Sequence, residues 1–152
     1  DEREFAAIWE KDIAPYRAGV GARLSGVMPA HVIYSAVAPN PAGFSRFWLQ
    51  DVLRSRVGFS GVVFSDDLTM EGATLVGDIV AGAEAAHSAG CDMVLVCNRP
   101  DLADDLLARW APKFGADSLN RIAALQAAPR PVVAPDRLVA ARATVHALVG
   151  DA

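Results

Sequence analysis

The clearest indication of the fold of this chain is the segment Gly61-Val62-Val63-Phe64-Ser65-Asp66-Asp67-Leu68-Thr69-Met70-Glu71-Gly72. Its apolar residues run directly into two adjacent carboxylates, and a short polar segment that ends in glycine follows. This pattern predicts a buried strand over residues 61–65 that delivers acid groups at its C-terminal end, as strands of parallel α/β folds do with catalytic side chains. Asp66 is therefore the candidate catalytic carboxylate.

Asp66 and Asp67 are neighbours on an extended backbone, where successive side chains point to opposite sides. We therefore expect only one of the two carboxylates to face a substrate. The local pattern alone leaves three roles open for this acidic turn: a nucleophile or base, a ligand for Mg²⁺, and a cap for the following helix.

Two further strands are predicted from the apolar pattern. A short one lies within residues 22–28 and ends before Pro29, because proline cannot donate to a ladder. The other covers residues 92–97, whose continuous apolar run is typical of a strand buried on both faces. Helices are predicted over residues 1–16, 45–56, 78–89, 100–110, 117–127 and 135–149.

The alternation of strands and helices predicts an α/β fold with parallel strands. Three parallel strands leave two sheet edges to be covered, so we expect the chain to be one part of a larger sheet. Residues 112–152 carry no motif, and we interpret them as packing or capping helices.

Composition excludes several classes of protein. With 152 residues, of which 53% are hydrophobic and 21% charged, the chain fits one globular domain and not a disordered segment. The net charge of −4 and the lack of a basic cluster predict no nucleic-acid partner. No run approaches the roughly 18 apolar residues of a spanning helix, so we expect no membrane partner, and the acidic N-terminus is unlike a signal peptide.

The cysteines and one histidine are first interpreted as structural. Cys91 and Cys97 would lie roughly 20 Å apart on one strand, which is too far for a disulfide. Reduced thiols fit a cytoplasmic protein. His31 falls just past the end of the first strand, where position alone favours a structural histidine over a ligand.

Basic side chains near the ends of two predicted helices are expected at the surface. Arg54 and Arg56 suit the negative end of the dipole of the 45–56 helix, and we interpret them as solvated. His87 lies near the end of the 78–89 helix and receives the same interpretation.

Several segments resemble the family 3 glycoside hydrolases, in particular the bacterial β-N-acetylhexosaminidases of peptidoglycan recycling. In chain order they are Val27-Met28-Pro29-Ala30-His31-Val32-Ile33-Tyr34, Pro41-Ala42-Gly43-Phe44-Ser45, the opening stretch with Leu53-Arg54 and Gly58-Phe59-Ser60 before it and Ala73 after it, and Ala89-Gly90-Cys91-Asp92-Met93. The resemblance covers about residues 1–100, and the remaining third matches loosely.

The resemblance implies one partial domain over residues 1–152, the C-terminal portion of a TIM-type (β/α)₈ barrel. Residues 1–111 would hold about three βα units with the last three strands, and residues 112–152 would add C-terminal helices. In this family the first aspartate of the Ser-Asp motif, here Asp66, is the nucleophile that forms a covalent glycosyl-enzyme with retention of configuration.

The resemblance also assigns the neighbours of Asp66. His31 would line the sugar site, and Met28 and Met70 are assigned to it as well. Asp67 inherits no catalytic role and is interpreted as structural. No metal or organic cofactor is implied. The expected reaction is hydrolysis of terminal N-acetylglucosamine from peptidoglycan-derived muropeptides in the cytoplasm.

The family's remaining catalytic motifs are not found. Its general acid/base is a histidine paired with an aspartate on a loop before the helix that matches residues 1–16, and a Lys-His-Phe-Pro-Gly motif also lies upstream. None of the three histidines, His31, His87 and His146, has that context.

A retaining mechanism needs two catalytic groups, and loss of general acid–base catalysis lowers the rate by about 10²–10⁴-fold. We therefore expect the N-terminal half of the barrel as a partner, whether a separate chain or a missing segment, and a poorly soluble or inactive chain without it.

Three alternatives are weighed. A β-glucosidase-like member would usually carry Tyr in place of His31 and Trp in place of Asp67. A non-catalytic interaction domain would have kept the motif after losing the acid/base half. A Mg²⁺-dependent receiver-type domain would need an acidic pair after its first strand and a late lysine, whereas the only lysines are Lys11 and Lys113.

Overall fold

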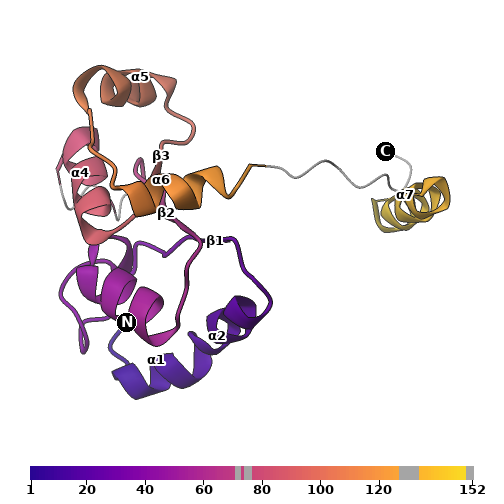
Figure 1. Cartoon of the computed structure of the whole chain (residues 1–152), viewed down its shortest axis with the longest axis horizontal. Helices are drawn as coiled ribbons and strands as arrows, with labels where there is room; N and C mark the ends of the chain where they lie inside the picture. Colours follow the sequence, from indigo (N-terminus) through magenta and orange to yellow (C-terminus); the bar gives the residue numbers. More distant parts are fainter. Residues whose placement is uncertain (71–72, 74–76, 127–133, 150–152) are drawn as a thin grey trace.

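The computed structural model describes residues 1–70, 73, 77–126 and 134–149. Figure 1 shows a small parallel sheet with helices packed around it and α7 standing apart from the other elements. The elements are, in chain order, α1 (Phe5–Lys11), α2 (Ala14–Gly21), β1 (Gly26–Val27), η1 (Ala42–Phe44), η2 (Phe47–Arg56), β2 (Val62–Asp67), α4 (Ile79–Ala89), β3 (Met93–Leu95), α5 (Pro100–Arg109), α6 (Ala116–Ala123) and α7 (Pro135–Val149).

The sheet has the order β1-β2-β3, and both pairings are parallel. Gly26 pairs with Val62 and Val27 with Val63. The predicted α/β class with parallel strands is therefore confirmed. The first strand is shorter than expected, because its ladder ends at Val27 and the chain leaves the sheet toward Pro29.

The third strand is less buried than its apolar run predicted. Met93, Val94 and Leu95 are all partly exposed. Within the part of the chain that the structure describes, β1 and β3 each pair with β2 alone. The expectation that β3 is buried on both faces is thus wrong, and among the described strands β3 lies at an edge of the sheet.

The predicted helix over residues 1–16 is two helices. The first ends at Lys11, the chain turns at Asp12 and Ile13, and the second begins at Ala14. Pro15 lies in the first turn of α2, where its missing N–H breaks no helical hydrogen bond. The single helix predicted over residues 1–16 is therefore wrong, and Pro15 marks the start of the second helix.

The helix that precedes β2 has π-type geometry over ten residues, Phe47–Arg56. Ser45 caps its start, because the Trp48 N–H donates to the Ser45 hydroxyl oxygen at 3.4 Å. Its end is marked by Gly58, whose φ of +78° lies in the left-handed region that favours glycine. The observed boundaries agree with the helix predicted over residues 45–56, whereas the π geometry was not predicted.

Two clusters of buried apolar side chains hold these elements together. The larger lies between β2, η2 and α4, where Val63, Ala83 and Ala86 are fully buried. The smaller joins α1 to the start of η2 through Ile8 and Trp48. Among the described residues, no helix combines the length and apolarity needed to cross a membrane.

Candidate active site

The acidic turn contains an irregularity in the β2–β3 ladder. Phe64 pairs with Met93 and Asp67 with Leu95, so two residues of β2, Ser65 and Asp66, lie opposite one residue of β3. This is a β-bulge, which bends a strand and redirects a side chain. The regular alternation expected for Asp66 and Asp67 therefore does not hold unchanged.

Ser65 replaces the hydrogen bond that the bulge disrupts. Its side chain is completely buried, and its hydroxyl oxygen accepts the Leu95 N–H at 3.0 Å. The same hydroxyl donates to the Asp66 carbonyl at 2.8 Å. A serine before Asp66 thus stabilises the bulged backbone, a role that the sequence pattern did not reveal.

Asp67 is held by hydrogen bonds to its carboxylate. One carboxylate oxygen accepts the N–H groups of Thr69 and Cys97, each at 3.0 Å, and the other accepts the Thr69 hydroxyl at 2.8 Å. Burial alone would raise the pKa of Asp67, but these hydrogen bonds outweigh it and bring the pKa below its ordinary value. The geometry agrees with a structural Asp67 that ties β2 to the segment after β3.

Asp66 is partly buried, and its carboxylate makes a single contact among the described residues. Its Oδ1 accepts the Asp67 N–H at 2.8 Å. No other described group donates to this carboxylate, which leaves Oδ2 available for chemistry at the C-terminal end of β2.

Neither carboxylate of the acidic turn caps α4, the first helix after β2 whose bounds the structure describes. Helix α4 is capped by Asp78, whose side chain accepts the Ala81 N–H at 2.9 Å. The residues described include no group of three or more His, Cys, Asp or Glu that could hold a metal ion. Because the Asp67 oxygens already accept three hydrogen bonds, Asp66 and Asp67 are poorly arranged as a shared Mg²⁺ site.

His31 and Met70 both contact the Asp67 carbonyl oxygen. His31 Nε2 lies 3.1 Å from that oxygen, and the Met70 N–H donates to it at 3.1 Å. The structure thus brings two of the predicted site residues to the residue beside Asp66. Glu71 and Gly72, at the end of the predicted motif, lie outside the described residues.

Met28 lies in a different environment from the other predicted site residues. It is half exposed and lines an apolar cavity of about 320 Å³ between α1, α2, β1 and η2, together with Tyr34 and Trp48. Asp66 does not line this cavity. The Trp48 indole N–H is buried there without a partner among the described residues. This cavity is therefore not a sugar site on its own.

Asp92 is the most connected charged residue that sequence analysis missed. It is 2% exposed and accepts hydrogen bonds from the Val63 N–H at 2.9 Å and the Ser118 hydroxyl at 2.7 Å. Arg54 and Arg121 form ion pairs with it at 2.8 and 2.6 Å. These interactions gather at the N-terminal end of β3, away from the acidic turn.

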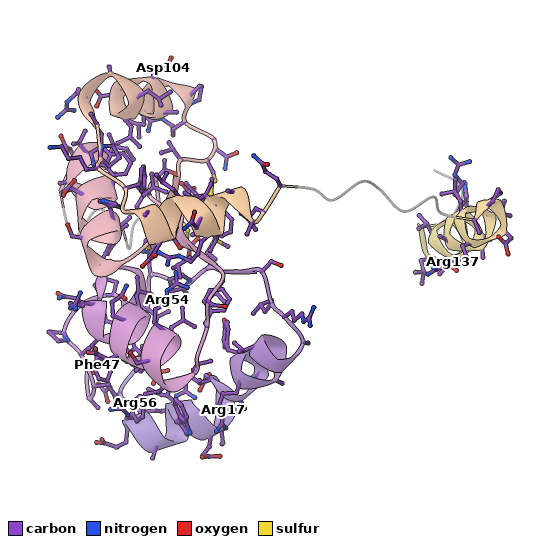
Figure 2. The ribbon with its side chains drawn as sticks, in the orientation of Figure 1. Arg17, Phe47, Arg54, Arg56, Asp104 and Arg137 are labelled. Carbon is purple, nitrogen blue, oxygen red and sulfur yellow. The ribbon has the colours of Figure 1, made fainter. Side chains whose placement is uncertain are left out.

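The prediction that Arg54 is solvated is wrong. Its guanidinium also donates to the carbonyls of Phe59 and Gly61, at 3.1 and 2.6 Å. Its side chain is 14% exposed, and Figure 2 shows it between η2 and α6. Arg56 lies beside α1, with its guanidinium carbon 5.1 Å from the centroid of the Phe5 ring. Burial and then the neighbouring Arg121 lower the pKa of Arg54, whereas Asp92 opposes this shift. An acid immediately before an apolar strand was the available signal for this buried pair.

His87 is also more enclosed than predicted. Its ring meets Trp110 and Phe114 edge to face, with centroids at 5.9 and 4.9 Å. Its Nδ1 is buried without a partner among the described residues. The surface assignment is wrong because the chain after α5 folds back over α4.

Cys91 and Cys97 are unbonded, and the structure predicts that they differ in reactivity. Burial and the nearby Asp92 charge raise the pKa of Cys91 to about 12, so its thiolate fraction at pH 8 is about 10⁻⁴. We expect iodoacetamide to modify Cys97 in the native protein and Cys91 only in urea. Peptide mass spectrometry checks this, with Cys97→Ser as control. Equal native labelling of both thiols would contradict it.

Residues 1–111 match the glycosyl hydrolase family 3 N terminal domain. The β-hexosaminidase of Aromatoleum aromaticum is 72% identical over 130 residues, which are 86% of this chain and 36% of that protein. The β-hexosaminidase of Bordetella parapertussis is 57% identical over 136 residues, 90% of this chain and 38% of that protein. The chain thus spans somewhat more than a third of the length of these relatives.

Two solved structures from Neisseria gonorrhoeae are similar in fold. Native NagZ superposes with a TM-score of 0.78 at 36% identity, covering 99% of this chain and 44% of that chain. NagZ in complex with N-trifluoroacetyl-D-glucosamine gives a TM-score of 0.72 at 43% identity, covering 81% of this chain and 34% of that chain.

Proposed function

The chain belongs to glycosyl hydrolase family 3, and we propose that it is the nucleophile-bearing part of a retaining β-N-acetylglucosaminidase. The proposed substrates are peptidoglycan-derived muropeptides that carry a terminal N-acetylglucosamine. Support comes from relatives named β-hexosaminidase and from a similar structure that holds an N-acylated glucosamine. The two unbonded cysteines fit the cytoplasm, where we place the protein.

The observation that carries this proposal is the arrangement of Asp66. One of its oxygens is fixed by the Asp67 N–H, and the other accepts from no described group at the C-terminal end of a parallel strand. In the proposed reaction this second oxygen forms a bond to the anomeric carbon while the glycosidic C–O bond breaks. Water then hydrolyses the covalent intermediate and regenerates the carboxylate.

The leaving oxygen needs a proton, which a second group must provide. We propose that this group belongs to the N-terminal half of a (β/α)₈ barrel, with the present strands as its last three. In the described part of the chain both outer strands have a free edge, and the apolar cavity beside β1 contains the unpartnered Trp48 N–H. An added strand next to β1 would fill the cavity and accept from that N–H.

The sugar would bind above the C-terminal ends of the strands. His31 and Met70 would line this site beside Asp66, since both contact the Asp67 carbonyl. Met28, half exposed just after β1, would contribute from the neighbouring strand. Residues 112–152 are assigned to the same domain as its C-terminal helical segment.

The test is to reconstitute the barrel and trap the nucleophile. The chain would be combined with the portion of the Aromatoleum aromaticum β-hexosaminidase that it does not match, and treated with a 5-fluoro N-acetylglucosaminyl fluoride. We expect one sugar label on Asp66, located by peptide mass spectrometry, and hydrolysis of a chromogenic N-acetylglucosaminide.

Two controls sharpen that test. The Asp51→Asn variant removes an exposed carboxylate of η2 and should label like the unmodified chain. A label on any residue other than Asp66 would refute the assignment. Faster hydrolysis of a glucoside than of the N-acetylglucosaminide would instead indicate a β-glucosidase-like enzyme.

A further inference from the structure

The contact between His31 and the Asp67 carbonyl determines where the ring carries its proton. A carbonyl oxygen only accepts hydrogen bonds, so His31 Nε2, at 3.1 Å, must be the donor. The Met70 N–H donates to the same oxygen at 3.1 Å. This assigns the Nε2–H tautomer to neutral His31, in which Nδ1 is unprotonated.

The rest of the ring is confined by protein. It stacks on Phe44 with centroids 5.0 Å apart and planes at 23°. Its Nδ1 is buried and has no partner among the described residues. The loop that carries His31 is closed by a hydrogen bond from the Ala42 N–H to the Val32 carbonyl at 2.8 Å. Nδ1 is thus enclosed by protein and Nε2 is engaged with the Asp67 carbonyl, which leaves the ring carbons to touch a sugar.

Asp67 is consequently held at three points. Its N–H meets Asp66, its carboxylate meets Thr69 and Cys97, and its carbonyl meets His31 and the Met70 N–H. Among these partners, His31 belongs to the loop that follows β1, the strand that pairs with β2. Fixing the Asp67 carbonyl fixes the rotation of the Asp67 backbone and with it the direction of the N–H that orients Asp66.

We propose that His31 is a positioning residue, which acts through the Asp67 main chain to orient the Asp66 carboxylate. This inference rests on the proposed role of Asp66 as nucleophile. It differs from sugar recognition, because loss of the Nε2–H donor then slows the attack of Asp66 and leaves substrate affinity largely unchanged. A misplacement of about 1 Å at a reacting atom costs about 10²-fold in rate.

Two substitutions separate these roles. His31→Leu keeps an apolar side chain against Phe44 and removes the donor, so kcat and the trapping rate are expected to fall about 10- to 100-fold with little change in KM. His31→Gln keeps an N–H at a similar reach and is expected to recover most of that loss. His146→Leu replaces an exposed histidine of α7 and serves as the matched control.

The experiment uses the reconstituted barrel and the 5-fluoro reagent. A label away from Asp66 in the unmodified chain overturns the proposed function itself. A label on Asp66 at the same rate in His31→Leu leaves that function intact and overturns the positioning role, as does a rise in KM alone. The ¹⁵N NMR shifts of the His31 ring provide a measurement without substitution: an Nε2–H tautomer is expected, and an Nδ1–H tautomer contradicts the inference even if a variant does not assemble.

Discussion

Replacement of Asp66 by asparagine is expected to lower kcat of the reconstituted enzyme by about 10⁴-fold or more, because no covalent glycosyl-enzyme can form. The side-chain oxygen of the new amide would still accept the Asp67 N–H, so the bulged turn and the assembled protein should remain folded. The measurement is steady-state hydrolysis of a chromogenic N-acetylglucosaminide, with circular dichroism as the check on folding.

An added nucleophile provides a second measurement on the same residue. In an Asp66→Gly variant, azide can enter the space of the missing carboxylate and attack the anomeric carbon directly. We expect azide to restore turnover and give a glycosyl azide of inverted configuration. Retention of more than about a tenth of the original kcat by the asparagine variant, without azide, would contradict the assignment.

Replacement of Asp92 by alanine is expected to destabilise the protein by about 3–5 kcal/mol, the usual cost of removing one partner from a buried ion pair. Asp92 is 2% exposed, and its partners Arg54 and Arg121 are 14% and 26% exposed. Two guanidinium groups would then lose their counter-charge inside the protein. Urea unfolding of the assembled protein, followed by circular dichroism, measures the free energy of unfolding.

A matched control is the exposed pair of Asp101 with Arg99 at the start of α5, whose side chains are 62% and 54% exposed. Asp101→Ala should change stability little, because surface ion pairs contribute little. An equal loss of unfolding free energy in the two variants would contradict a large contribution from the buried Asp92 ion pairs. Loss of Asp92 should also weaken the attachment of α6, since Ser118 and Arg121 of that helix donate hydrogen bonds to its carboxylate.

The contribution of Asp92 has a definite pH dependence. Burial alone would raise its pKa, but the hydrogen bonds from Arg121, Val63 and Ser118 outweigh this and bring the pKa below its ordinary value. A lowered carboxyl pKa gives stability that is present above the ordinary pKa, about 3.9, and is lost as the pH falls through the lowered value. The difference in unfolding free energy between the original protein and Asp92→Ala should therefore persist at neutral pH and become smaller only in strong acid.

Local sequence signals predicted those elements whose boundaries are determined by neighbouring residues. Helix α4 begins after the capping Asp78 and ends before Gly90, whose φ is +120°, and both boundaries were predicted. The break between α1 and α2 was missed because Pro15 is compatible with a helix start as well as with a helix end. The propensities of residues 47–56 likewise do not distinguish π from α geometry.

The candidate site was predictable only where its residues are neighbours in the sequence. Asp66 and Asp67 stand in one run of sequence, and the family resemblance assigned them different roles. The Arg54–Asp92 pair joins residues 38 positions apart, and the bulge at Ser65 depends on the register with β3. Such features require knowledge of which strands and helices meet, which no local pattern contains. The hydrogen bond from His31 to the Asp67 carbonyl belongs to this class.

The bulge at Ser65 and Asp66 makes the structure of the acidic turn depend on the number of its residues. Between the Phe64–Met93 and Asp67–Leu95 pairs, β2 holds one residue more than β3. Deletion of a single residue there would restore a regular ladder and turn the remaining side chain toward a different face of the sheet. In laboratory evolution of this turn we therefore expect conservative exchanges such as Ser65→Thr to be recovered, whereas insertions and deletions between Phe64 and Asp67 should disappear from the surviving library.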